Sequence, residues 1–224
     1  MTFTVIQMSV KTRRLLSAYD IKTPLTSYHE HNKQAKLENI LHFLQDGDVA
    51  IVSEAGMPGM SDPGYELIKA ASERGIPVIP IPGPSAVIAA LVVSGLPTDR
   101  FLYLGFLPRR ASARRTLLES VADEPGTIVI LEAPHRLQAT LRDLQLTLGD
   151  RQIAVCRELT KLHEEVFRGT ISQAMAHFAA PRGEFTLVIE GKREKKKPQL
   201  TEAIEQRLKE RYLAGATAKE AIAE

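Results

Sequence analysis

The 224-residue sequence contains little cysteine and few aromatic residues. Cys156 is the only cysteine, which excludes an internal disulfide and disfavours a zinc site built from thiolates. Tryptophan is absent and aromatic residues make up 5% of the chain, so stacking of single-stranded bases is not expected to be the main binding device. Low cysteine usage is compatible with a reducing, cytoplasmic location.

The sequence also has no long apolar run and no large net charge. The longest apolar run, 86–93, is far shorter than the roughly 20 residues of a membrane-spanning helix, so no membrane contact is expected. Residues 1–14 lack the basic segment and apolar stretch of a secretory signal. With 29 Lys and Arg against 27 Asp and Glu, the formal charge is +2, which excludes an extended polybasic or acidic disordered protein.

Short β-branched runs alternate with helical stretches, a pattern that predicts an α/β protein with parallel or mixed sheets. Asp62 is predicted as the N-cap of a helix that has Pro63 at its first position and ends at Gly75. The predicted strands are 48–53, 76–81, 101–104, 127–131, 153–156, 165–168 and 185–190. Further helices are predicted at 84–94, 112–122, 136–148 and 171–178. The two prolines in 76–81 indicate an edge strand or an irregular one.

Composition suggests four parts of the chain. The Pro- and Gly-rich segment 83–107 separates two series of elements, so we expect α/β lobes at 1–82 and 83–191. A basic linker at 192–199 is predicted to lead into a partial helical domain at 200–224. A second helix is expected from the capping-box pattern at Thr217 to Glu220. The tail is equally compatible with a helix–turn–helix appendage cut short and with a solvated terminal helix.

Two glycine- and proline-rich bends each follow a predicted strand. Ser53–Gly64 reads SEAGMPGMSDPG, and glycine there would let the backbone approach a ligand closely. Ligands of α/β folds gather at the C-terminal ends of strands, and a helix N-terminus adds partial positive charge. A purely structural turn explains this bend equally well. In the second bend, 82–86 (PGPSA), the residues alone favour Ser85 as a helix cap over a ligand contact.

Charged motifs follow later strands. Glu132–Arg136 (EAPHR) suits acid–base or phosphate chemistry, or a salt-bridged helix start. RELTK at 157–161 could close a site or form a solvated turn. Phosphate contacts are expected for a cluster of four arginines, Arg109, Arg110, Arg114 and Arg115. His29 and His31 could face a metal, but no third ligand is evident, and a polar loop or helix start is favoured.

Together these motifs resemble the ribosomal RNA small-subunit methyltransferase I family, within the tetrapyrrole-methylase-like superfamily. That family reads approximately SDAGTPGISDPG where this chain has Ser53–Gly64. It shares PGPSA, an F-x-GFLP stretch (here FLYLGFLP, 101–108), an E-x-PHR stretch, RELTK and TSYHEHN (26–32), in the same order. The similarity runs from about Thr12 to Gly191.

The resemblance implies a bilobal tetrapyrrole-methylase-like fold that binds S-adenosylmethionine between two α/β lobes, and a homodimer. The implied reaction is 2′-O-methylation of a cytidine in the decoding region of 16S rRNA in the small ribosomal subunit. No metal is implied. Matched position by position, the expected cofactor residues are Ala55, Gly56, Met57, Pro58, Ser61, Ser85 and Ala86. Glu132 and His135 are the candidates for the general base, and Arg136 joins the arginine cluster as an RNA contact.

The sequence departs from the family at three places. Glu54 stands where the family has Asp, and Met57 stands where it has Thr. The family's first strand and glycine-bearing loop are not matched ahead of Thr12, so we expect an exposed sheet edge and an open wall of the cofactor cleft. Two alternatives therefore stay open: a methyltransferase acting on a tetrapyrrole or other small molecule, and a non-catalytic RNA-binding truncated homologue.

Overall fold

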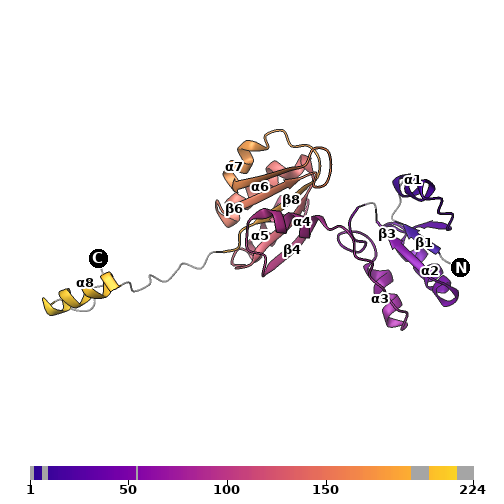
Figure 1. Ribbon diagram of the computed structural model, residues 1–224, viewed down its shortest axis with the longest axis horizontal. Helices are drawn as coiled ribbons and strands as arrows, with labels where there is room; N and C mark the ends of the chain where they lie inside the picture. Colours follow the sequence, from indigo (N-terminus) through magenta and orange to yellow (C-terminus); the bar gives the residue numbers. More distant parts are fainter. Residues whose placement is uncertain (1–2, 7–9, 54, 193–201, 216–224) are drawn as a thin grey trace. The chain divides into compact units, whose positions relative to one another are not determined.

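The computed structural model describes residues 3–6, 10–53, 55–192 and 202–215 (Figure 1). The chain divides into two compact units, residues 1–192 and 193–224. The first unit contains two separate sheets, one of three strands and one of five. The expected division of this unit into lobes at residue 82 stays a prediction.

The three-stranded sheet is entirely parallel. Its strands are β1 (Phe3–Ile6), β2 (Leu25–Ser27) and β3 (Val49–Val52), in the order β2-β1-β3. The accompanying helices are α1 (Val10–Ala18), α2 (Lys33–Asp46) and α3 (Tyr65–Glu73). Helices α2 and α3 pack against β3 through a small apolar core that includes Ile40, Leu41 and Leu67.

Strand β1 is an element that we did not predict. We predicted no strand ahead of Thr12, yet Phe3–Ile6 pairs on both sides and forms the centre of the sheet. The exposed edge was expected because this first strand was thought to be missing, and that expectation is wrong in its premise, since β1 is present. Among the described residues, the edge strands of this sheet are β2 and β3. Segment 76–81 is not a strand in the structure, and Ile79 and Ile81 are each 77% exposed.

The five-stranded sheet is mixed. It consists of β4 (Phe101–Phe106), β5 (Thr127–Glu132), β6 (Gln152–Arg157), β7 (Glu165–Thr170) and β8 (Phe185–Ile189). The order is β4-β5-β8-β6-β7, with β4 parallel to β5 and the remaining pairs antiparallel. Each of these strands coincides with a predicted one to within two residues at either end.

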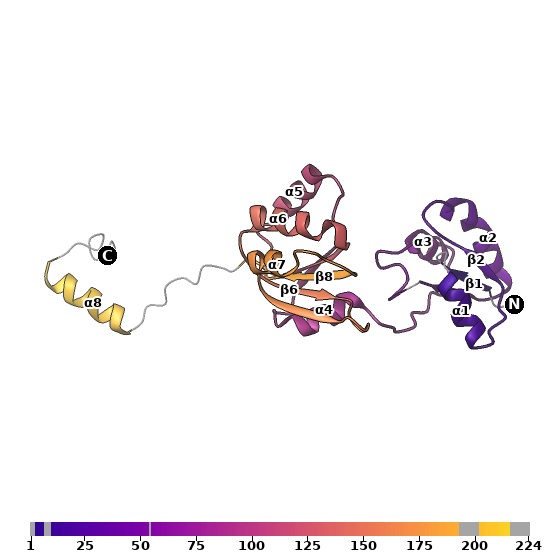
Figure 2. The same ribbon diagram turned by 90° about the horizontal axis from the view of Figure 1, so that it is seen from above.

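Helices cover both faces of this larger sheet (Figure 2). Helix α4 (Ala86–Ser94) packs on one face against Val129, Ala154 and Val188. The opposite face carries α5 (Ala111–Ser120), α6 (Leu137–Leu148) and α7 (Ile171–His177). Leu137, Leu141, Leu144 and Leu148 follow the period of a helix and form the buried stripe of α6. Burial of these apolar side chains is the main stabilising contribution of this layer.

Helix caps confirm one prediction and correct another. Ser85 caps α4, because its Oγ accepts a hydrogen bond from the Ile88 N–H at 3.4 Å, and Gly95 ends that helix in the left-handed conformation. Asp62 is not the N-cap of α3. The cap is Gly64, whose φ of 154° suits glycine, and no side chain caps this helix.

The second unit contributes helix α8 (Glu202–Leu213), followed by Gly215 in a left-handed conformation. The expected linker residues 193–199 and the helix expected from Thr217 lie outside the described residues. Among the residues that the structure does describe, no helix combines the length and the apolar character needed to span a membrane.

Candidate functional site

The two glycine–proline bends lie against each other. A Cβ added at Gly56 would lie 3.6 Å from the carbonyl oxygen of Pro84, and one added at Gly83 would lie 3.5 Å from Sδ of Met57. The bends therefore lie close together, near enough that a methyl group on either glycine would touch the other bend, although almost thirty positions separate them. This is the arrangement that a shared ligand site at the two bends requires.

Local hydrogen bonds and glycines shape the first bend. Ser53 Oγ donates to the carbonyl oxygen of Gly56 at 2.8 Å and so closes the turn that follows β3. Gly56 and Gly59 have φ values of 71° and 82°, a conformation that side chains rarely adopt. Ala55 and Gly56 are exposed, and Met57 and Pro58 are half-buried, while Glu54 lies outside the described residues.

An apolar groove adjoins this bend. Met57 and Pro58 line it together with residues of β3, α3 and the extended segment 76–81, and its volume is about 460 Å³. The groove lies beside the open edge of β3. Its size and apolar lining suit a planar, weakly polar group of the size of a purine base.

A hydrogen bond ties the far end of the first bend to the larger sheet. Ser61 Oγ and the hydroxyl of Tyr103 in β4 are 2.6 Å apart. Ser61 has a φ of 59°, an uncommon value for a residue other than glycine. Gly105, at a bulge of β4, makes room for this contact, because a Cβ there would lie 3.2 Å from Ser61 Oγ. Tyr103 was not among the predicted site residues.

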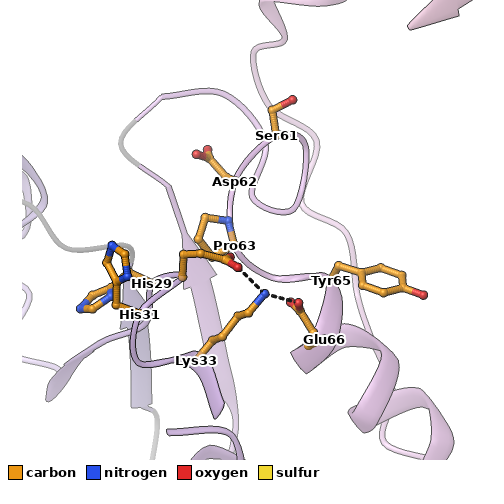
Figure 3. A pocket seen from close by; sticks show the side chains of 9 residues that line it. His29, His31, Lys33, Ser61, Asp62, Pro63, Tyr65 and Glu66 are labelled. Carbon is orange, nitrogen blue, oxygen red and sulfur yellow. Dashed lines mark hydrogen bonds and ion pairs between the residues drawn. The ribbon is translucent and has the colours of Figure 1, made fainter. Parts of the chain in front are cut away.

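A polar cavity of about 530 Å³ opens where the first bend meets the start of α2 (Figure 3). Lys33 lies between two carboxylates, at 2.7 Å from Glu30 and in direct contact with Glu66. The hydrogen bonds that Lys33 donates to Glu30 and Glu66 raise the pKa of Lys33, and the one to Glu66 lowers the pKa of that carboxyl group. Both groups are therefore charged at neutral pH.

Histidines form another wall of the cavity. His29 and His31 lie edge to face with ring centroids 6.0 Å apart, and both line the cavity that Asp62 and Pro63 also line (Figure 3). The ring of Tyr65 points away from Lys33 in the same view. Among the described residues, no group of three or more His, Cys, Asp and Glu side chains has the spacing of a metal site.

The EAPHR turn is held together by Glu132, which is 1% exposed. One carboxylate oxygen accepts from the Ala133 N–H at 2.9 Å, and the other accepts from Thr140 Oγ1. Arg136 lies 3.3 Å from the same carboxylate. With both oxygens engaged and only 1% of the residue exposed, Glu132 fits a structural role, and its use as a general base stays a prediction. His135 is exposed at the start of the 3₁₀ helix η1 (Pro134–Arg136).

Two of the arginines expected to contact RNA point into the protein. Arg114 is 6% exposed, and its Nε donates to Asp143 Oδ2 at 2.7 Å. Arg136 donates to the carbonyl oxygens of Leu107 and Pro108 at 2.7 and 3.2 Å, which fixes the end of the GFLP stretch. Arg114 is thus engaged inside the fold, whereas Arg136 keeps an Nε without a hydrogen-bond partner. The RNA contacts expected of these two arginines stay predictions.

The other arginines of the cluster differ from one another. Arg115 is half-exposed, but its Nε donates to the second oxygen of Asp143 at 2.8 Å. Arg109 and Arg110 are exposed just before α5 and are the members available to a phosphate. Asp143 was missed in the sequence because nothing in its own neighbourhood distinguishes it from a solvated residue of an amphipathic helix.

The remaining predicted residues have local roles in the structure. Ser85 caps α4, and Ala86 is the first residue of that helix. In RELTK, Lys161 bridges Glu158 and Glu184 at 3.0 and 2.7 Å, so the segment forms a charged turn. The cavity residues Lys33 and Glu66 were missed, although the TSYHEHN motif directly precedes Lys33 and could have indicated them.

Comparison with known proteins gives a consistent result. The family model for Tetrapyrrole (Corrin/Porphyrin) Methylases matches residues 5–175. A Synechocystis protein named ribosomal RNA small subunit methyltransferase I is 51% identical over 195 residues, which cover 85% of this chain and 70% of the relative. Proteins of the same name from Halalkalibacterium halodurans and Thermotoga maritima are each 48% identical, with 66% and 83% of their lengths covered. The chain thus spans about two thirds or more of these relatives.

Solved structures of lower similarity share the fold. The methyltransferase CobJ is 14% identical with a TM-score of 0.59, covering 87% of this chain and 97% of that one. Uroporphyrin-III C-methyl transferase from Thermus thermophilus, solved with S-adenyl homocysteine, is 16% identical with a TM-score of 0.53 and covers 84% and 97%. These likenesses establish the α/β methylase fold that the motifs predicted.

Proposed function

The chain belongs to the ribosomal RNA small subunit methyltransferase I family of the tetrapyrrole methylases, and on that premise we propose that it methylates ribosomal RNA. The reaction is transfer of a methyl group from S-adenosylmethionine to the 2′-hydroxyl of a cytidine in 16S rRNA of the small ribosomal subunit. The observation that carries the proposal is the close approach of the two bends, Gly56 toward Pro84 and Gly83 toward Met57, in a chain about half identical to a protein of that name.

The residues at the two bends fit S-adenosylmethionine. Bare backbone at Gly56 and Gly83 allows close approach of a ligand, and the apolar groove beside Met57 and Pro58 suits the adenine ring. Ala55 and Ser61 lie on the same bend, and Ser85 and Ala86 open the helix after the second bend. Since Ser85 already caps α4, we expect it to contribute to cofactor binding by fixing the position of the start of that helix.

S-adenosylmethionine carries a sulfonium, so when bound it supplies a methyl group that is already activated. The work of the protein is then to hold the acceptor hydroxyl in line with that methyl group. Positioning of this kind can lower a barrier by several kcal/mol, up to about 7–11 kcal/mol in ideal cases. The ordered turn at Ser53 and the Ser61–Tyr103 hydrogen bond are the features that fix the bend for this task.

The acceptor hydroxyl must also lose a proton, and His135 is our candidate to receive it. Its exposed imidazole can reach a ligand, whereas Glu132 is enclosed by Ala133, Thr140 and Arg136. A general base contributes typically about 10²–10⁴-fold to the rate. Glu132 then affects the reaction indirectly, because it holds the EAPHR turn that carries His135 in position.

Exposed positive charge supports RNA as the substrate. Arg109 and Arg110 precede α5 and are free of the Asp143 pair that holds Arg114 and Arg115. Phosphate neutralisation by such side chains supplies affinity without sequence preference. We further propose that the protein acts as a homodimer in the cytoplasm, where ribosomal subunits are assembled.

The proposal is tested with the purified chain, labelled S-adenosylmethionine and small ribosomal subunits that lack the modification. We expect label in 16S rRNA at the 2′ position of one cytidine. A tetrapyrrole offered under the same conditions should stay unlabelled, and its methylation in place of RNA would favour the small-molecule alternative. Calorimetric titration with S-adenosylmethionine excludes the non-catalytic alternative if heat of binding is observed.

A further inference from the structure

Two stretches of the chain, which the proposed function uses only at Ser61, come together at the polar cavity. One contributes His29, Glu30, His31 and Lys33, and the other contributes Ser61, Asp62, Pro63, Tyr65 and Glu66. Ser61 is shared between this cavity and the bend proposed to hold the methyl donor. The polar cavity therefore meets the methyl-donor bend at Ser61, whereas the apolar groove meets the same bend at Met57 and Pro58.

The volume and the charges of the cavity restrict its ligand. About 530 Å³ is within the usual range for a small-molecule site and is enough for one nucleoside. Glu30, Glu66 and Asp62 contribute carboxylates, whereas Lys33 is the only lysine or arginine among the lining residues. A phosphate group would face net negative charge here, so the cavity suits an uncharged group rich in hydrogen-bond donors and acceptors.

The Lys33–Glu66 pair presents a donor beside an acceptor. An ammonium has three N–H donors, and Glu30 and Glu66 take two of them. A carboxylate has about four acceptor positions, of which Glu66 uses one for Lys33. The Watson–Crick edge of cytosine carries the complementary pattern, an exocyclic amine next to a ring nitrogen that accepts.

We propose that this cavity binds the base of the acceptor nucleotide, with Glu66 accepting a hydrogen bond from the exocyclic amine and Lys33 donating to the adjacent ring nitrogen. The inference rests on the proposed function and assigns it a base-recognition site. The neighbouring structure holds Lys33 and Glu66 in place. Asn32 Oδ1 accepts from the His29 N–H at 2.8 Å and orders the turn that starts α2, from which Lys33 projects. The first turn of α3 carries Glu66.

Glu66→Gln tests the proposal, because the amide can still accept but also presents a donor and has no charge. We expect the KM for small subunits to rise about tenfold, since a base contact of this kind discriminates by roughly one order of magnitude. Affinity for S-adenosylhomocysteine, measured by calorimetry, should stay unchanged. Replacing the target cytidine by uridine in the RNA should cost the wild type about tenfold and the variant much less.

The matched control is Glu38→Gln. Glu38 forms an ion pair with Arg74 at 3.1 Å and so links α2 to the C-terminal end of α3. The Lys33–Glu66 pair links the N-terminal ends of the same two helices. Unlike Glu66, Glu38 does not line the cavity. Both variants lose one carboxylate from an ion pair between the same elements. Equal effects on KM would overturn the proposal and leave only a structural role for Glu66.

A second variant covers the case in which Glu66→Gln fails to fold. His31 is exposed on the wall of the cavity, and His31→Ala should also raise KM for RNA while leaving binding of S-adenosylhomocysteine intact. An unchanged KM in that variant would contradict the base site. If the wild type methylates no ribosomal RNA at all, the proposed function fails; if it does and these variants match the control, only the base site fails.

Discussion

The hydroxyl of Tyr103 lies 2.6 Å from Oγ of Ser61, and this bond joins the first glycine–proline bend to a strand of the larger sheet. The two residues are 42 positions apart. Ser61 holds a left-handed backbone conformation at this point, which costs of order 1 kcal/mol or more and persists only where surrounding contacts impose it. The bend is therefore held from outside as well as by its own glycines.

Tyr103→Phe should weaken that restraint without disturbing the packing of the ring. We expect a loss of about 1 kcal/mol in the free energy of unfolding, the usual contribution of one hydrogen bond. Because the bend then becomes less ordered, affinity for S-adenosylhomocysteine should fall several-fold. Urea unfolding and calorimetry measure the two effects. Tyr19→Phe, at a side chain that is 72% exposed, is the control and should change neither.

Gly105→Ala should be more harmful than an alanine at a left-handed glycine with free space around it. The φ of Gly105 is 63°, and an added Cβ would press on Ser61 Oγ at 3.2 Å. Gly95, with a φ of 77° and a ψ of 10°, is left-handed, and an added Cβ there would meet only the side chain of Arg168, at 4.0 Å. Gly95→Ala therefore isolates the cost of the backbone conformation, about 1 kcal/mol. We expect Gly105→Ala to exceed that cost and, unlike Gly95→Ala, to weaken binding of S-adenosylhomocysteine. Equal behaviour of the two variants would show that the Ser61 contact is unimportant.

The pair Arg114–Asp143 should make the larger sheet layer sensitive to acid. Burial alone would raise the pKa of Asp143, but hydrogen bonds from Arg115 and Arg114 outweigh it and hold the pKa below its ordinary value. The carboxylate thus stabilises the fold above a pH of about 4, the pKa of an unfolded Asp, and that contribution is lost as pH falls through the lower folded pKa.

Asp143→Asn is expected to cost about 3–5 kcal/mol at pH 7, because it leaves the buried guanidinium of Arg114 without its counter-charge. The difference in unfolding free energy between wild type and variant should shrink when urea titrations are repeated at pH 3. A difference that is independent of pH would mean that the ionised form of Asp143 does not stabilise the fold.

Arg109→Gln and Arg110→Gln should each weaken RNA binding, because each removes one positive charge. Each should lower the slope of log affinity against log salt by about one unit if the side chain contacts a phosphate. Arg115→Gln serves as comparison, since its guanidinium is engaged by Asp143. Fluorescence anisotropy with a labelled fragment of small-subunit RNA, titrated at several salt concentrations, measures the slopes. Identical slopes for the wild type and the Arg109 and Arg110 variants would rule out these contacts.

The strands of the larger sheet were predictable from the sequence because each is a short run that contains β-branched or aromatic residues. Ser85 and Gly95 likewise indicated the ends of α4 through local chemistry that needs no tertiary contact. Strand β1 was missed because Phe3–Ile6 does not match the family's first strand, and its place at the sheet centre depends on pairing with distant strands.

The sequence indicated the two bends but not the partners of buried charged residues. Glycines and prolines marked both bends, whereas their close approach depends on tertiary structure, because segment 76–81 before the second bend is not a strand. The sequence did not show that Glu132, Arg114 and Arg136 have partners inside the fold, because a charged residue in a sequence does not show whether its partner lies in solvent or in the protein. Asp143 pairs with Arg114 across 29 positions, a distance over which no local pattern operates.

Nuclear magnetic resonance during a titration with S-adenosylhomocysteine tests most directly whether the two bends together hold the methyl donor. We predict that the amide signals of Gly56 and Gly83 shift along one saturable curve with a common dissociation constant, while that of Gly149 stays in place. Binding that moves neither glycine, or the absence of saturable binding, would contradict the assignment of the site.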